Sequence, residues 1–137
     1  MRVLGIDVGR RRIGLAISDP LGVTAQGLET LQRKNNRADF AALVSLAREK
    51  EVARFVVGLP LHMSGDESRQ GVFVREFADR LRRETGLPVE LWDERLTTVQ
   101  AERVLKESGV SLDKRKRAVD RLAAVLLLEN WLEARGA

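Results

Sequence analysis

The feature that most constrains this fold is the stretch GIDVGRRRIGLAISD, residues 5–19, which lies almost at the start of the chain. Residues 2–9 and 12–18 are short, apolar runs that favour strands, and Gly9 with a basic turn separates them. Two such runs across a short turn predict a β-hairpin. The first run carries one carboxylate, Asp7, inside what should be a core strand. Because a charge removed from water is costly without a partner, Asp7 needs a cation, a metal or a hydrogen-bond network.

The rest of the chain alternates between strand and helix patterns. We expect, in chain order, a weaker strand over 22–31, a helix over 39–50 that Asp39 caps or favours at its N-terminus, a strand over 53–59, a helix over 71–85, a strand over 88–92, a helix over 96–106, a basic connection over 108–117 and a last helix over 118–134. This order predicts an α/β fold, a five-stranded mixed sheet whose first three strands are antiparallel, flanked by helices on both faces. No repeat or linker divides the chain, so we expect one domain over residues 1–137.

Composition narrows the classes of function. The chain has no cysteine and one histidine, His62, which excludes a disulfide scaffold, a thiolate metal site and a histidine-rich zinc site within one monomer. No apolar stretch approaches the roughly 20 residues of a membrane span, and the N-terminal apolar run is too short for a secretory signal. We therefore expect a soluble cytoplasmic protein that does not use a membrane.

The charge balance points to a polyanionic partner. The chain carries 24 Lys and Arg against 20 Asp and Glu, a formal net charge of +4. Most of the basic residues are arginine, whose guanidinium forks onto phosphate oxygens. A basic small domain favours nucleic acid as a partner, although a generally charged surface would give the same balance.

The surroundings of Asp7 suggest a site. Strand alternation puts Asp7 on the face that carries little side-chain bulk, and the same face of the next strand holds three small residues, Gly14, Ala16 and Ser18. Two neighbouring strands with a cleared face would leave room for a substrate backbone. The alternative is a structural aspartate that pairs with Arg10, Arg11 or Arg12.

Two further acidic positions are candidates. In WDERLTT, residues 92–98, Asp93 and Glu94 come where a strand ends, and strand ends are where mixed sheets place ligands. The alternative is an acidic pair that favours a helix N-terminus. Asp120 stands in line with the apolar stripe of the last helix, namely Ala124, Leu127 and Trp131, and so points at the body of the protein. The small residues Ala123 and Ala124 would let this helix lie close to the sheet.

Separated carboxylates that converge can bind a divalent cation. Hard oxygen ligands without cysteine or a histidine cluster favour Mg²⁺ or Mn²⁺ over zinc. A bound dication would relieve the mutual repulsion of the carboxylates. Two such ions could activate water and stabilise the leaving oxygen in phosphodiester hydrolysis.

Four ordered motifs resemble the YqgF/RuvX family over nearly the whole chain: GIDVGRRRIGLAISDP, VVGLPLHMSGDESRQ, LWDERLTT and VDRLAAVLLLENWL. Members of that family are described as Holliday-junction resolvases or pre-16S rRNA-processing nucleases with an RNase H-like fold. The resemblance implies a single RNase H-like nuclease domain over residues 1–137. It also implies Asp7, Glu94 and Asp120 as catalytic residues and metal ligands, with Asp93 and Glu67 as alternates for the middle position.

The resemblance and the charge pattern together suggest a surface for nucleic acid. The arginines after the first strand and the basic run before the last helix would flank the metal site, and the loop after residue 60 could meet a phosphate. The expected nucleic-acid-binding residues are Arg10, Arg11, Arg12, His62, Arg95, Lys114, Arg115, Lys116 and Arg117. The alternative for each run is a solvated turn.

The expected function is that of a two-metal-type endonuclease acting on structured RNA or branched DNA. It would process the 5′ end of pre-16S rRNA in ribosome biogenesis, with the ribosome as a further candidate partner, resolve Holliday junctions, or do both. Junction resolution predicts a homodimer, whereas rRNA processing needs only a monomer. Two rival functions stay open, a non-catalytic RNA- or ribosome-binding module and the phosphate-binding domain of an actin-like ATPase. The second rival needs two such domains, and this chain has the length of one.

Overall fold

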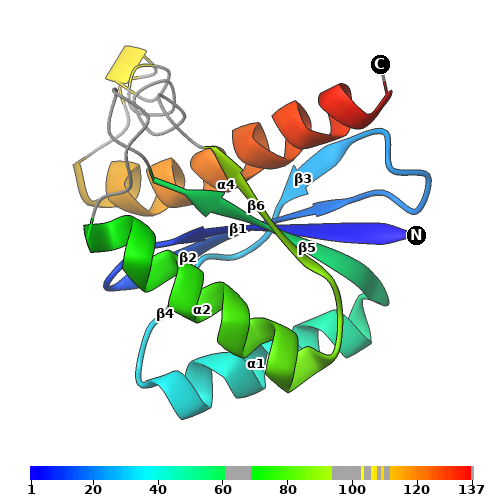
Figure 1. The fold of residues 1–137 in the computed structure, drawn as a ribbon. Coiled ribbons are helices and arrows are strands. Elements are labelled where there is room, and N and C mark those ends of the chain that lie inside the picture. The colour runs from blue at the N-terminus through cyan, green and yellow to red at the C-terminus, as the bar shows by residue number, and fades with distance from the viewer. Residues whose placement is uncertain (61–68, 94–102, 104–105, 108, 110–111, 137) are drawn as a thin grey trace.

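The structure, a computed structural model, describes residues 1–60, 69–93, 103, 106–107, 109 and 112–136. Its helices and strands follow one another as shown in Figure 1: β1 (Arg2–Val8), β2 (Arg12–Ser18), β3 (Ala25–Gly27), β4 (Leu31–Gln32), α1 (Asn36–Glu49), β5 (Val52–Leu59), α2 (Arg69–Thr85), β6 (Val89–Asp93) and α4 (Leu112–Gly136). The predicted hairpin, the mixed sheet and the alternation of helix and strand are confirmed. None of the helices within the described ranges is long and apolar enough to cross a membrane.

The strands form one mixed sheet in the order β3-β2-β1-β5-β6, with β4 also paired to β2. Strands β1, β2, β3 and β4 are joined by antiparallel pairs, and β1, β5 and β6 run parallel to one another. The prediction of one strand over 22–31 was wrong, because that segment forms two short strands and the sheet therefore has six. Leu28 and Leu31 both pack against the core. Residues three apart in a regular strand point to opposite faces, so the chain leaves the ladder between them.

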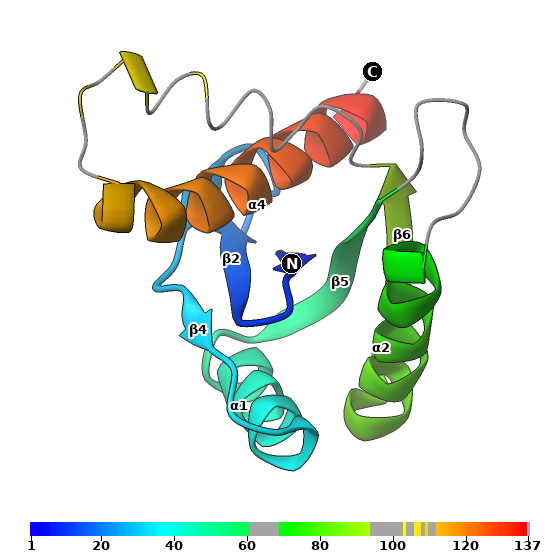
Figure 2. The ribbon, with the colours of Figure 1, turned by 90° about the vertical axis from the view of Figure 1, so that its left-hand side faces the viewer.

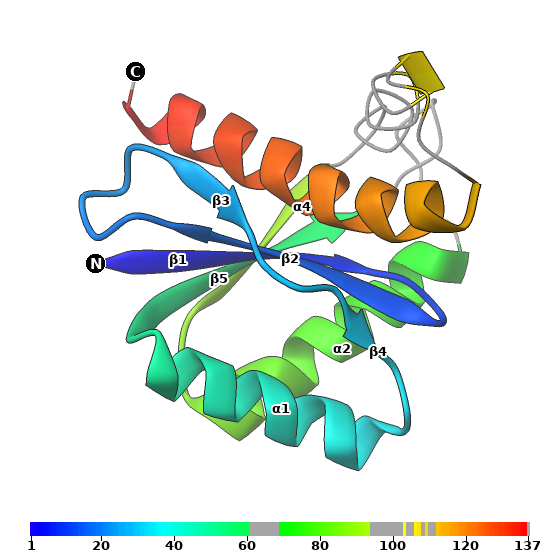
Figure 3. The same cartoon turned by 180° about the vertical axis from the view of Figure 1, so that it is seen from behind.

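Helices cover both faces of the sheet, as predicted. Figures 2 and 3 show α4 on one face and α1 with α2 on the other. Leu4, Ile6 and Val8 of β1 lie in the core cluster beneath α1 and α2, whereas Val3 lies in the cluster that α4 closes. The alternation predicted for β1 is thus confirmed, and it places Asp7 on the face of α4.

Small residues bring α4 very close to the sheet. A Cβ added to Gly14 would lie 2.0 Å from the backbone oxygen of Asp120, and one added to Gly5 would lie 3.0 Å from Cβ of Leu128. On the helix, Ala123 and Ala124 are buried, as predicted. The expectation that this cleared face admits a substrate backbone is wrong, because α4 fills it along β1 and β2.

Helix α1 begins earlier than predicted, and Asp39 is not its cap. The cap is Asn35, whose side chain accepts the backbone N–H of Ala38 at 2.8 Å. Asp39 lies in the first turn and is only 2% exposed. It accepts bonds from Nε of Arg33 at 3.1 Å and from the backbone N–H of Lys34 at 3.0 Å. Asp39 therefore ties the chain before α1 to the helix.

Helix α4 also begins earlier than predicted, at Leu112 rather than at residue 118. The basic run 114–117 therefore lies within the helix and not in a connection before it. Lysine and arginine are good helix formers, and no glycine or proline interrupts residues 112–117, so the helix extends through them. The helix predicted over 96–106 lies largely outside the described residues, although Arg103 and Lys106 are helical.

Candidate active site

Three parallel strands and the start of α4 meet at one edge of the sheet. Strands β1, β5 and β6 end there, and in the ladders Ile6 pairs with Val57 and Leu59 pairs with Asp93. Figure 1 shows the arrowheads of β5 and β6 on the same side as the first turns of α4. Carboxyl ends of parallel strands in open sheets are where ligands bind. The predicted carboxylates should therefore lie at this edge if they form a site.

Asp7 and Asp120 come together at this edge across Gly14. Asp7 is the ladder partner of Gly14, and Gly14 lies directly against the backbone of Asp120. Asp7 is half-buried, and the side chain of Asp120 is 22% exposed. Two carboxylates far apart in the sequence thus lie on the same face of the sheet and within reach of solvent.

Arg12 is the cation that pairs with Asp120. Its Nε donates to Oδ2 of Asp120 at 2.7 Å, and its side chain is 27% exposed. Of the three arginines expected near Asp7, Arg12 forms an ion pair with Asp120. The pairing arises because β2 and α4 pack closely at Gly14. Arg10 and Arg11, the other two arginines of the turn, are exposed.

The middle carboxylate of the predicted set is only partly described. Asp93 ends β6, is exposed, and shares its strand parity with Val89 and Leu91, which pack under α2. It therefore falls on the sheet face opposite to Asp7. Glu94 and Glu67 lie outside the described residues, as do His62 and Arg95. Within the described ranges, no group of three or more His, Cys, Asp or Glu side chains is gathered as a metal site would require.

The acidic residue of β6 that does face α4 has a structural partner. Glu90 accepts a hydrogen bond from the indole Nε1 of Trp131 and pairs with Arg54 at 3.4 Å. The guanidinium of Arg54 also lies 6.0 Å from the centre of the Trp131 ring. These contacts fasten the second half of α4 to β5 and β6, away from the carboxyl ends of the strands.

A residue that sequence reasoning missed, Arg33, braces the turn that follows Asp7. Its guanidinium donates to the backbone oxygen of Gly9 at 3.2 Å and to Oδ1 of Asn36 at 3.1 Å, besides the bond to Asp39. Its own backbone N–H donates to the oxygen of Arg11 at 2.9 Å. In the sequence, the only sign of this ion pair is the Asp39 carboxylate itself. Nothing in the neighbouring sequence shows which arginine pairs with it.

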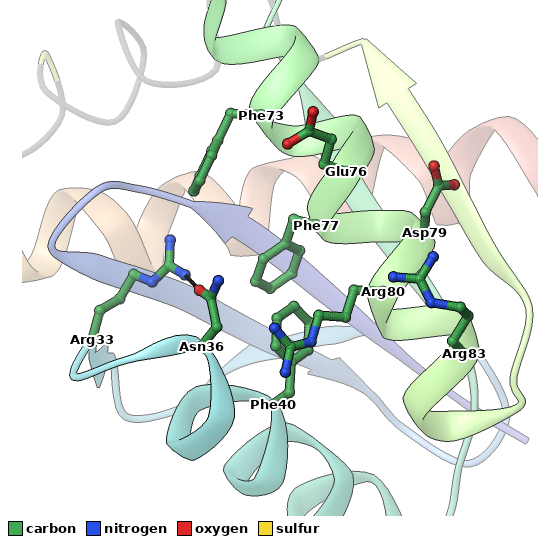
Figure 4. A pocket seen from close by; sticks show the side chains of 9 residues that line it. All are labelled: Arg33, Asn36, Phe40, Phe73, Glu76, Phe77, Asp79, Arg80 and Arg83. Carbon is green, nitrogen blue, oxygen red and sulfur yellow. Dashed lines mark hydrogen bonds between the residues drawn. The ribbon is translucent and has the colours of Figure 1, made fainter.

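Arg33 also lines a pocket of about 370 Å³ between α1 and α2, drawn in Figure 4. Aromatic rings and guanidinium groups line it. The ring centres of Phe40 and Phe77 lie 4.8 Å apart, the guanidinium carbon of Arg80 lies 4.7 Å from the ring centre of Phe40, and that of Arg33 lies 5.4 Å from the ring centre of Phe73. These contacts bind α1 to α2. The pocket is on the opposite side of the sheet from Asp7 and Asp120, so it does not belong to their site.

Comparison with known proteins identifies the family of this chain and the class of its fold. The family model RuvX, described as Holliday junction resolvase, matches residues 1–134. A protein of Koribacter versatilis named "Putative pre-16S rRNA nuclease" is 58% identical over 135 residues, which cover 98% of this chain and 88% of the relative. RuvC of T. thermophilus in complex with Holliday junction substrate aligns with a TM-score of 0.61 at 18% identity, covering 100% of this chain and 96% of that chain.

A viral structure gives the same result for the fold. The Fowlpox virus resolvase, solved with substrate Holliday junction DNA, aligns with a TM-score of 0.57 at 14% identity, covering 98% of this chain and 99% of that chain. At these identities the two solved structures establish the architecture. The family model and the close relative establish the family. The chain has an RNase H-like fold and belongs to the RuvX family of nucleases, hydrolases that act on phosphodiester bonds.

Proposed function

We propose that residues 1–137 act as one metal-dependent endonuclease domain that cleaves structured nucleic acid. The observation that carries the proposal is the juxtaposition of Asp7 and Asp120 across Gly14, where the parallel strands end. Membership in a nuclease family supports the reaction class. The half-buried position of both carboxylates supports their use, because they can hold a cation and still be reached from solvent.

The residues at this edge fit a hard divalent cation. Asp7 and Asp120 offer oxygen ligands, and the chain has no cysteine that would favour a softer metal. We propose Glu94 as the third ligand, with Glu67 as the alternate. Asp93 is the weaker alternate, since its strand parity puts it on the other face. When bound, Mg²⁺ or Mn²⁺ supplies activation of water and neutralises charge at the leaving oxygen.

Basic residues around this edge would hold the substrate backbone. Arg10 and Arg11 are exposed in the turn after Asp7. The run 114–117 lies in the first turns of α4 and precedes Asp120 by less than two helical turns. We propose that these residues, with Arg12, His62 and Arg95, contact phosphates and so position the chain on nucleic acid without reading its sequence.

For the substrate, we propose 5′-end processing of pre-16S rRNA first and Holliday-junction resolution second. The name of the 58%-identical relative supports the RNA, and the two solved structures with junction DNA share the fold at much lower identity. A single site in a monomer suffices for RNA processing within a ribosomal precursor. Junction resolution needs two coordinated cuts and therefore a homodimer.

The test compares the wild type, Asp7→Asn and the control Asp79→Asn, whose carboxylate is exposed on α2 and pairs with Arg82. Each is assayed with Mg²⁺ and with Mn²⁺ on a mobile four-way DNA junction and on RNA spanning the 5′ end of 16S rRNA. We expect Asp7→Asn to lose cleavage and to keep or slightly raise its unfolding free energy, because repulsion within the acidic pair is removed. The control should cleave like the wild type.

The possible outcomes distinguish the candidate functions from one another. Cleavage of the RNA alone indicates a processing nuclease, and paired symmetric nicks in the junction indicate a dimeric resolvase. Normal Mg²⁺-dependent cleavage by Asp7→Asn would refute the site. Tight binding of either substrate by the wild type without any cleavage would indicate a non-catalytic binding module.

A further inference from the structure

We propose that Arg12 is the resident counter-ion of Asp120, and that a divalent cation must displace its guanidinium before Asp120 can bind the metal. The inference rests on the proposed function, because it takes Asp120 as a metal ligand. It gives Arg12 a part beyond the phosphate contact expected from its sequence. Arg12 sets how tightly the free protein holds metal.

The first ground is that Asp120 needs a positive partner. It lies on the stripe of α4 that faces the sheet, in line with the buried residues Ala124 and Leu127, and only 22% of its side chain is exposed. A carboxylate that has lost most of its water is costly without a compensating charge. Arg12 supplies that charge through a charge-assisted bond of 2.7 Å from Nε to Oδ2.

The second ground is that the backbone of Asp120 is fixed next to Arg12, so the carboxylate can turn about its own side-chain torsions but stays near Arg12. The backbone of Asp120 is held against Gly14, so closely that a Cβ on Gly14 would lie 2.0 Å from the backbone oxygen of Asp120. Gly14 is in turn the ladder partner of Asp7. A metal shared by Asp7 and Asp120 would therefore lie beside Arg12, and two cations at one carboxylate group repel each other.

The third ground is that Arg12 can leave without disturbing the fold. Its backbone is fixed, because the oxygen of Arg12 accepts the N–H of Gly9 at 2.9 Å and the residue pairs with Gln32 of β4. The side chain has several rotatable bonds and is 27% exposed, so torsions alone can turn the guanidinium toward solvent. Solvent at this edge is where the substrate phosphates would lie, so the released guanidinium becomes available to them.

The direction in which metal affinity changes when Arg12 is removed distinguishes competition with the metal from support of the metal site. If Arg12 competes with the metal, its removal raises metal affinity. If Arg12 instead holds Asp120 in the right position for the metal, its removal lowers metal affinity. By linkage, the metal must weaken the Arg12–Asp120 bond by the same factor by which that bond weakens metal binding.

The experiment measures Mn²⁺ binding to the full chain without nucleic acid, by paramagnetic resonance of the free ion and by calorimetry. The variants are Arg12→Gln and the matched control Arg11→Gln. Both remove one positive charge from the same turn, but only Arg12 pairs with Asp120. We expect Arg12→Gln to bind Mn²⁺ at least about tenfold more tightly than Arg11→Gln, the lower end of what a hydrogen bond to a charged group contributes. Should Arg12→Gln not fold, Arg12→Met keeps the aliphatic stem and serves in its place.

A second readout follows the bond itself. The ¹⁵N-resolved resonance of the Arg12 Nε–H should lose its slow solvent exchange as Mg²⁺ is added, with the same midpoint as metal binding. Equal Mn²⁺ affinities of the two variants, weaker binding by Arg12→Gln, or an Nε–H unchanged by saturating Mg²⁺ would each overturn the proposal. Absence of Mn²⁺ binding by both the wild type and Arg12→Gln would instead refute the metal site of the proposed function, and this proposal with it.

Discussion

Replacing Gly14 with alanine tests whether the contact between β2 and α4 is as close as the structure has it. A Cβ at residue 14 would lie 2.0 Å from the backbone oxygen and 2.6 Å from the backbone carbon of Asp120. Carbon and oxygen do not approach closer than about 3.3 Å in ordinary contacts, so one backbone must retreat by roughly 1.3 Å. A helix backbone cannot rotate aside as a side chain can.

The size of the effect follows from two opposing contributions. Overpacking of a close contact costs about 1–3 kcal/mol, and an obstacle made of backbone belongs at the upper end of that range. Alanine also restricts the unfolded chain relative to glycine, which returns about 0.4–1 kcal/mol. We expect Gly14→Ala to lower the free energy of unfolding by about 2 kcal/mol.

The assay is denaturant unfolding followed by tryptophan fluorescence. Trp131 lies buried on α4, and Trp92, the other tryptophan of the chain, packs against the same cluster, so the signal reports whether α4 is docked. Gly27→Ala is the matched control, because it changes a neighbouring strand that also faces α4. There the new Cβ would meet Cγ and Cδ of Arg121 at 2.7 and 2.8 Å, the flexible part of a side chain that can swing away. If the two variants unfold at the same denaturant concentration with equal slopes, the reasoning from Gly14 is refuted.

Two further predictions concern charges away from the site. Arg33→Met leaves the buried Asp39 carboxylate without its cationic partner and should lower the unfolding free energy by about 3 kcal/mol. The double variant with Asp39→Leu should recover part of this loss, and a double variant no more stable than Arg33→Met would contradict the role of the ion pair. Hydrogen bonds from the backbone N–H of Thr24, and also of Val23, lower the pKa of Asp19 below its ordinary value. Ionised Asp19 therefore stabilises the fold above its unfolded pKa of about 3.9, and the contribution is lost as pH falls through the lowered folded pKa. Asp19→Asn should have a lower unfolding free energy than the wild type at neutral pH and an equal one in strong acid. The check is denaturant unfolding of both proteins from acid to neutral pH, and a difference in unfolding free energy that stays the same in acid would contradict the role of ionised Asp19.

The two faces of β1 and the inward stripe of α4 could be predicted from the sequence. Side chains of a strand alternate, and those of a helix recur at every third or fourth residue, so the sequence predicts the face on which Asp7 and Asp120 each lie. Both assignments hold in the structure. The small residues on β1, β2 and α4 also predict a face with little side-chain bulk. That face accommodates α4, however, and not a substrate backbone.

Element boundaries failed where a nonlocal contact or a weak local signal decides. The segment over 22–31 reads as one strand, yet Leu28 and Leu31 both pack against the core and split it. The basic run before Asp120 reads as a connection, yet its residues are good helix formers and continue α4. Asp39 is predicted to cap the helix or to favour its N-terminus. It lies in the first turn of α1, where its charge favours that end, but the cap is Asn35, and Asp39 pairs with an arginine of the preceding segment.

The sequence alone determined the class of protein, the sides of the strands and helices, and which carboxylates were available, because period, propensity and composition are properties of short stretches of chain. Tertiary structure decided which of those groups meet. The order of strands in the sheet and the close packing at Gly14 bring Asp7 beside Asp120 and make Arg12, rather than its two neighbours in the turn, the partner of Asp120. Distances between residues far apart in the chain depend on how the layers pack, and no local pattern contains that information.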